Sequence, residues 1–185
     1  MRLFERAGQF TVEPTQDYAA LRSLAGFSAV ALYVHGDVLP AREEQALVDF
    51  VAGGGGLLGI HCASASFYPN LRYRALLGCR FVEHAPDVHT FRVTVSNRRH
   101  PLAAGLTDFD VCCELYHCAC DAGLDVFLTA DWNGAPTPIA YTKSHGAGRV
   151  AYVALGHDER ALENRNVAEL LARASRWAST QAGSE

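Results

Sequence analysis

The chain has 185 residues, of which 49% are hydrophobic and 19% are charged, and its formal net charge is -4. This composition is that of an ordinary globular protein, and we expect a single domain over residues 1–185 with its core at about 10–178. The slightly acidic balance, with no block of Lys or Arg, excludes the basic surface that nucleic acids and anionic membranes require.

Membrane insertion and export are not indicated either. No apolar run approaches the roughly 18 residues that span a bilayer, and the start of the chain lacks the apolar core of a signal peptide. We therefore expect a cytoplasmic protein. The six cysteines form no C-x-x-C pair, so neither a zinc ribbon nor a thioredoxin motif is indicated, and we interpret them as reduced thiols.

The first strong pattern along the chain is a strand, a helix and a second strand. Residues 29–35 are a nearly continuous apolar run that ends in His35, and residues 40–52 have apolar side chains at helical spacing. A glycine turn then leads into the apolar run 57–60, which His61 follows. This order predicts a parallel βαβ unit, and ligands of such sheets bind beyond the carboxyl ends of the strands.

The second half of the chain is richer in strands. The residues at 91–95 alternate between apolar and polar, which indicates a strand with one wet face, at an edge or outside the parallel core. We further expect a helix at 71–77, strands at 111–117 and 126–130, a hairpin of 138–144 with 149–155, and a C-terminal helix at 167–178.

Six groups of short motifs follow one another along nearly the whole chain. They are GGGLLGIH at 54–61, LLGCRFVEH at 76–84, HP with GL at 100–106, ELY at 114–116, GAGRV at 146–150 and LGH at 155–157. Together they resemble the ThuA-like, or trehalose-utilisation, domains, and the resemblance runs from about Phe10 to Trp177. It implies a three-layer α/β domain, flavodoxin-like or class I glutamine amidotransferase-like, with a mainly parallel sheet. It also implies a role in trehalose or keto-sugar metabolism.

The chain departs from the family pattern in two places. The family normally has a strand and a helix upstream of the segment that matches Phe10, so this domain is expected to lack the usual first strand. That strand is internal in a doubly wound sheet, and its absence predicts a gap, a rearranged sheet or a truncated start. An exposed edge would let two copies pair, which makes a homo-oligomer an expectation. Cys113 stands where we expect an acidic residue, which argues against a role for two adjacent carboxylates.

Four residues at or near strand ends are the candidates for chemistry: His61, His84, Glu114 and His157. If the fold brings them together, three imidazoles and a carboxylate would suit a divalent metal such as zinc, with His61, His84 and His157 as ligands. They would equally suit a general acid/base site in which His61, Glu114 and His157 are catalytic. The structural alternative is that the histidines bond to backbone groups and that Glu114 pairs with an arginine.

Three further contacts with a small-molecule sugar are expected. His84 and His35 would line the pocket. The ring of Tyr116 could stack on a sugar face, although packing in the core is the preferred interpretation for a single aromatic residue. The working hypothesis is an isomerase or lyase that moves a proton at a carbon next to a carbonyl group, with or without a metal. A non-enzymatic sugar-binding or assembly module is the second hypothesis.

The third hypothesis is a hydrolase of the amidotransferase type that uses Cys62, His157 and Glu159. Amidotransferases place their nucleophilic cysteine at a strand-to-helix elbow of the form G-x-C-x-G. Here His61 occupies that position and Cys62 comes one residue later. Because one step along a tight elbow turns the side chain away, a space-filling role for Cys62 is the preferred interpretation.

Overall fold

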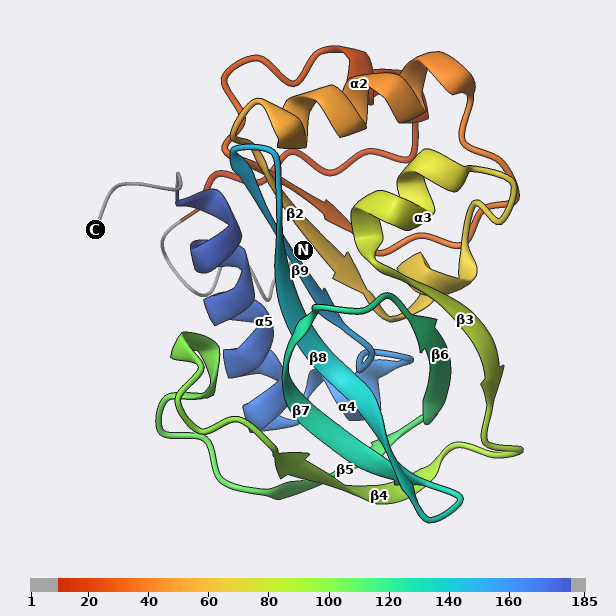
Figure 1. Cartoon of the computed structure of the whole chain (residues 1–185), viewed down its shortest axis with the longest axis vertical. Helices are drawn as coiled ribbons and strands as arrows, with labels where there is room; N and C mark the ends of the chain where they lie inside the picture. Colours follow the sequence, from red (N-terminus) through yellow and green to blue (C-terminus); the bar gives the residue numbers. More distant parts are fainter. Residues whose placement is uncertain (1–9, 181–185) are drawn as a thin grey trace.

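The computed structural model describes residues 10–180, and a seven-stranded sheet forms its centre (Figure 1). In their order across the sheet, the strands are β1 (Ala29–Leu32), β2 (Gly56–Ile60), β9 (Gly148–Val153), β8 (Ala135–His145), β7 (Asp125–Trp132), β4 (His89–Val95) and β5 (Phe109–Cys113). A second sheet pairs β3 (Cys79–His84) with β6 (Tyr116–Cys120).

Several helices surround these strands, and none of them in the described part of the chain is long and apolar enough to cross a membrane. The α-helices are α2 (Ala41–Ala52), α3 (Leu71–Leu77), α4 (Glu159–Leu162) and α5 (Arg165–Ser179). The 3-10 helices are η1 (Tyr18–Arg22), η2 (His61–Ala65) and η3 (Pro101–Ala103).

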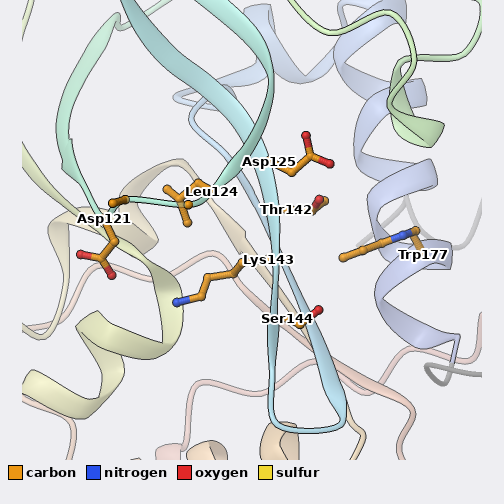
Figure 2. A pocket seen from close by; sticks show the side chains of 9 residues that line it. Asp121, Leu124, Asp125, Thr142, Lys143, Ser144 and Trp177 are labelled. Atoms are coloured by element: carbon orange, nitrogen blue, oxygen red, sulfur yellow. The ribbon is translucent and has the colours of Figure 1, made fainter.

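Helices cover both faces of the sheet, which confirms the expected three-layer α/β architecture. Figure 2 shows Thr142 of β8 on the side of Trp177 in α5, whereas Lys143 points the other way. On that second side the Nζ of Lys143 donates a hydrogen bond of 2.7 Å to the carbonyl oxygen of Ala75 in α3. Helix α2 packs beside α3.

The sheet is parallel only where β1, β2 and β9 lie side by side. Strand β1 pairs with β2, and β2 with β9, in parallel register. From β9 to β5 every pairing is antiparallel. The predicted parallel core is therefore present but small, and the sheet as a whole is mixed, because tight turns such as the one between β8 and β9 join neighbouring strands as hairpins.

The buried centre of the molecule is the pair β2 and β9. All five residues of β2 are buried, as its apolar sequence without alternation predicts. Helix α5 approaches β2 so closely that a Cβ atom on Gly56 would collide with the carbonyl oxygen of Ala178. This position therefore requires glycine.

Strand β1 lies at one edge of the sheet. Residues 10–28 contribute no strand, and the sheet runs from β1 to β5 without a gap. Of the outcomes expected from a missing first strand, an internal gap is therefore not found. Pairing of two copies through the edge of β1 stays a prediction.

The strand expected at 111–117 is two strands, β5 and β6, with Glu114 and Leu115 between them. The chain turns there from the large sheet into the small one, where β6 pairs antiparallel with β3. In that pairing His84 lies opposite Tyr116, and the small sheet thereby brings His84 next to Glu114.

Candidate functional site

His61 stands at the elbow where β2 ends and η2 begins. Its φ angle is 43°, which is uncommon for a residue with a side chain, and its exposed fraction is 2%. The Oη of Tyr152 lies 3.0 Å from the carbonyl oxygen of His61 and 2.7 Å from the Oγ of Ser64. Buried contacts thus hold this backbone conformation, as is common at functional sites.

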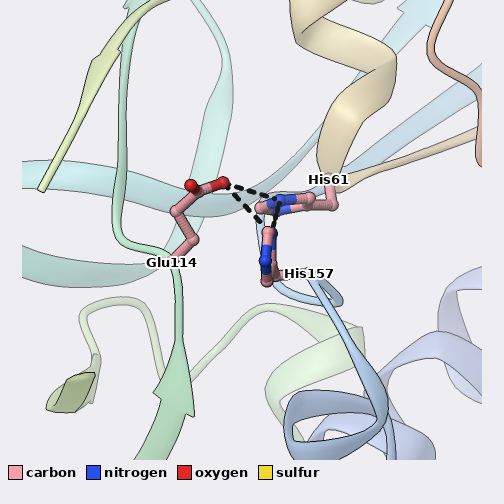
Figure 3. Close-up of side chains that lie close together, drawn as sticks. All are labelled: His61, Glu114 and His157. Atoms are coloured by element: carbon pink, nitrogen blue, oxygen red, sulfur yellow. Dashed lines mark hydrogen bonds and ion pairs between the residues drawn. The ribbon is translucent and has the colours of Figure 1, made fainter. Parts of the chain in front are cut away.

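Glu114 lies between β5 and β6, and its two carboxylate oxygens have different partners. Oε2 is 3.4 Å from the Nε2 of His61 and 3.2 Å from the Nδ1 of His157 (Figure 3), whereas Oε1 is 3.3 Å from the Nδ1 of His84. The Nδ1 of His157 is also 3.3 Å from the Nε2 of His61. The fold thus brings together the four residues that the sequence singled out, and we call His61, His84, Glu114 and His157 the cluster. The partners of Glu114 are imidazoles and not the arginine of the structural alternative.

His157 lies in the loop after β9, and Tyr33, the residue that follows β1, holds this loop by hydrogen bonds. The Oη of Tyr33 is 2.9 Å from the carbonyl oxygen of Gly156 and 3.2 Å from that of His157. Gly156 has a φ of 123°, and a Cβ there would lie 3.2 Å from the Cγ2 of Ile60. The loop therefore depends on glycine at this position.

Hydrogen bonding fixes the tautomer of His61. Its Nδ1 lies 2.8 Å from the carbonyl oxygen of Ala154. A carbonyl oxygen only accepts hydrogen bonds, so Nδ1 carries the proton and Nε2 presents a lone pair to Glu114 and His157. Burial lowers the pKa of His61, and the hydrogen bond to Ala154 opposes that shift. The ring is therefore held as a neutral imidazole.

Tyr116 supports His61 from within the core. The centroid of its ring is 4.1 Å from that of His61 and 4.5 Å from that of Phe81. Burial, followed by the charge of Glu114, raises the pKa of the Tyr116 hydroxyl. The ring is thus packed among other rings in the core, the alternative that sequence analysis preferred, and stacking on a sugar stays a prediction.

The remaining candidates, His35, Cys62 and Glu159, are not among the hydrogen-bond and ion-pair partners of Glu114 and His157. His35 is exposed beyond the end of β1 and, within residues 10–180, makes no hydrogen bond or ion pair with the cluster. Burial raises the pKa of the Cys62 thiol. Because His157 faces Glu114 and His61, and Glu159 is exposed, the arrangement does not assemble a triad of Cys62, His157 and Glu159.

Two surface clefts are also found away from the cluster. One, of about 630 Å³, lies near Phe50 and the glycine turn at 53–55, at the opposite end of β2 from His61. The other, of about 480 Å³, lies beside β8. In Figure 2 its Lys143 and Thr142 point to opposite faces of that strand, so its lining does not converge on one point. Neither cleft is lined by histidines, in contrast to the cluster.

Sequence reasoning missed the groups that hold the cluster in place. Tyr33 and Tyr152 look like strand residues, and the carbonyl of Ala154 has no sequence signal at all. The one available hint was a phenol group within an apolar strand, because a buried hydroxyl needs a partner.

Comparison with known proteins places these features in context. A family model described as ThuA, trehalose utilisation, matches residues 1–178. A ThuA-like protein from Parabacteroides merdae has a TM-score of 0.84 at 21% identity, over 97% of this chain and 82% of that chain. A ThuA-like protein from Bacteroides uniformis gives 0.82 at 20%, over 96% and 81%. A cytoplasmic protein from Salmonella typhimurium gives 0.77 at 15%, over 97% and 85%. At these identities the likeness shows the fold, and no curated protein sequence matches the chain.

Proposed function

This chain belongs to the ThuA family, described as trehalose utilisation, and on that premise we propose that it is an isomerase or lyase of a sugar or keto-sugar. The proposal rests on one observation, the carboxylate of Glu114 held among the imidazoles of His61, His84 and His157. Carboxylates and imidazoles are the side chains that most often transfer protons in enzymes near neutral pH.

The proposed step is proton transfer at a carbon next to a carbonyl group. The C–H bond breaks, its proton passes to a base of the cluster, and its electron pair forms an enolate whose charge lies on the carbonyl oxygen. In an isomerase, that oxygen and the former carbonyl carbon each take up a proton, and the neighbouring hydroxyl loses its proton to become the new carbonyl. In a lyase, a C–O bond one carbon further breaks, and the leaving oxygen keeps the electron pair and is protonated.

The exposure of the four side chains suits a site in which some residues are fixed and others meet the substrate. His61 is buried and fixed, whereas the side chains of His84 and His157 are 43% and 36% exposed and can reach a bound molecule. The side chain of Glu114 is 15% exposed and lies between them. A substrate that approaches from solvent would therefore meet His84, His157 and one edge of the carboxylate.

The test is turnover of keto-disaccharides derived from trehalose, and of simple keto-sugars, followed by NMR and mass spectrometry. We expect Glu114→Gln to lose turnover by about 10²- to 10⁴-fold, because a proton-transferring group contributes on that order. The matched control is Glu83→Gln, which changes an exposed carboxylate of β3. Equal turnover in Glu114→Gln and the parent would contradict the proposal, and saturable sugar binding without turnover would favour the binding-module hypothesis.

A further inference from the structure

Three atoms of the cluster form a nearly equilateral triangle (Figure 3). The Nδ1 of His157 is 3.2 Å from the Oε2 of Glu114, and the Nε2 of His61 is 3.3 Å from that Nδ1 and 3.4 Å from that Oε2. Zinc bonds to nitrogen and oxygen are about 2.0–2.2 Å long, so neighbouring ligands of a tetrahedral ion lie about 3.3–3.6 Å apart. The triangle therefore already has the size of one face of such a tetrahedron.

The lone pairs at this triangle need a proton or a cation between them. The Nε2 of His61 presents a lone pair, since its Nδ1 donates to Ala154, and the Oε2 of Glu114 is a carboxylate oxygen. Two acceptors that face each other repel unless a proton or a cation lies between them. The side chain of Glu114 is 15% exposed, and the ion-pair partners found for it in residues 10–180 are imidazoles. A divalent ion would satisfy all three atoms at once.

We infer that the Nε2 of His61, the Oε2 of Glu114 and the Nδ1 of His157 form a three-ligand site for a divalent transition-metal ion of the zinc type. This inference rests on the same cluster as the proposed function. Two imidazoles and one carboxylate are the donors that zinc and related first-row metals take, whereas magnesium and calcium prefer oxygen donors. The side chain of His157 is 36% exposed, so solvent reaches this edge of the triangle. A bound ion could therefore take water or a substrate oxygen as a further ligand, as catalytic zinc sites require.

The structure gives His84 a different place from the one that the sequence suggested. Its Nδ1 lies 2.6 Å from the carbonyl oxygen of Ala85 and 3.3 Å from the Oε1 of Glu114, the oxygen that faces away from the triangle. His84 therefore orients the carboxylate, as residues behind metal ligands commonly do. With the metal bound, His84 would be the one imidazole of the four residues that is not a ligand, and it could carry the proton in the proposed reaction.

The test is titration of the chelator-treated, dialysed full chain with Zn²⁺ against a competing chromogenic chelator. We expect one ion per chain in the parent and affinity at least about 100-fold weaker in Glu114→Gln and in His157→Ala, because each loses a ligand. His84→Ala should weaken binding by no more than about tenfold, the lower range for groups behind ligands. His89→Ala, which removes an exposed histidine at the start of β4, is the control and should bind as the parent does.

The absorption spectrum of bound Co²⁺ distinguishes a preformed tetrahedral site from non-specific metal binding. Co²⁺ in the parent should give the visible absorption of a tetrahedral ion, and Glu114→Gln, whose shape is nearly unchanged, should lack it while near-ultraviolet circular dichroism shows a native fold. No stoichiometric binding, or equal affinity in all variants, would mean an adventitious ion only and would overturn the inference. A loss in His84→Ala as large as that in His157→Ala would overturn the ligand set.

Failure of this inference can be told apart from failure of the proposed function. Turnover by a parent chain that binds no Zn²⁺ would overturn the metal site and leave acid/base catalysis in place. A bound metal without turnover of any keto-sugar would support the site and contradict the enzyme. Turnover that needs the metal, and that falls in His84→Ala while the metal stays bound, would support both.

Discussion

At the scale of single residues, the cluster depends on buried side chains that lie behind it. Tyr152 is buried beneath His61, and its hydroxyl contacts both the His61 carbonyl and Ser64. Tyr141, on the neighbouring strand, donates a similar buried bond of 2.8 Å to the carbonyl oxygen of Leu77, away from the cluster. The two tyrosines therefore allow a matched comparison.

We expect Tyr152→Phe and Tyr141→Phe each to lower the free energy of unfolding by about 1–2 kcal/mol, because each leaves a buried acceptor without its donor. Only Tyr152→Phe should also weaken zinc binding and turnover, by about tenfold, because it frees the backbone of His61. Urea unfolding measures the first effect, and zinc titration and keto-sugar turnover measure the second. An equal loss of turnover in both variants would show that Tyr152 has no special connection to the site.

His100 is a structural histidine whose hydrogen bonds require the neutral ring. Its Nε2 is 2.8 Å from the Oγ1 of Thr142, and its Nδ1 accepts the backbone N–H of Leu102 at 3.1 Å. Burial lowers the pKa of His100, and the charge of Asp125 opposes the shift. This agrees with the structural role that the His-Pro turn suggests.

A pKa that is lower in the folded than in the unfolded chain means that the unfolded state binds the proton more strongly. His100 therefore supports the folded state fully above its unfolded pKa of about 6.5, and this support is lost as the pH falls through the folded pKa. We expect the free energy of unfolding to fall as the pH drops below about 6.5, less steeply in His100→Asn than in the parent. The control His89→Asn should keep the parent's slope, and identical slopes for His100→Asn and the parent would refute the assignment.

At the scale of elements, the loop after β9 is what carries His157 to the cluster. Gly156 and Gly134 both have positive φ, at 123° and 84°, but only at Gly156 would a Cβ meet other atoms. Replacement by alanine should cost about 1–2 kcal/mol of backbone strain at either position. Gly156→Ala should in addition displace His157 and lower zinc affinity and turnover, whereas Gly134→Ala, in the turn between β7 and β8, should change stability alone.

Thermal unfolding, zinc titration and turnover of the two glycine variants decide this point. If Gly134→Ala affected the cluster as much as Gly156→Ala, general destabilisation would explain both. If neither variant changed zinc affinity, the geometry of the loop would not matter to the site.

The elements that could be predicted from the sequence are those with a local signal. Strand β1, helix α2, the buried strand β2 and helix α5 follow from apolar periodicity and from turn residues. The first strand was expected over 29–35, however, and in the structure it ends at Leu32. Strand β3 was not predicted because its sequence has no clear alternation, and it forms by pairing with β6, far along the chain. The break at Glu114 was missed because the direction of the chain there is set by the two different sheets that it joins.

The sequence predicted which residues form the site, but it did not predict how their side chains are arranged. His61 and His157 could be expected to meet because the carboxyl ends of parallel neighbours lie at one edge of a sheet. That Glu114 turns one oxygen to this pair and the other to His84 depends on the small sheet, which no local pattern reveals. The anchoring of the loop by Tyr33 depends likewise on a contact between distant segments.

At the scale of the whole molecule, the site forms where two differently built parts meet. His61 and His157 follow the parallel strands β2 and β9, Glu114 lies in the turn from β5 into the small sheet, and His84 ends β3 of that small sheet. Figure 1 shows β2 and β9 together with the small sheet of β3 and β6. A ligand that bridges these parts should stabilise the whole fold, because it binds the folded state and not the unfolded chain.

We therefore expect Zn²⁺ at about 100 times its dissociation constant to raise the free energy of unfolding by about 2.7 kcal/mol. Urea unfolding with and without Zn²⁺ measures this increase, and Glu114→Gln should show little of it at the same concentration. Stabilisation of equal size in the parent and in Glu114→Gln would place the ion elsewhere.

The measurement that tests the central claim most directly is solvent exchange at the carbon next to the carbonyl of a keto-disaccharide in D₂O, followed by proton NMR. The cluster should catalyse loss of that proton signal in the parent and in Glu83→Gln, and Glu114→Gln should slow it by about 10²-fold or more. Exchange no faster than in buffer, or equally fast in Glu114→Gln, would contradict the assignment of proton transfer to this site.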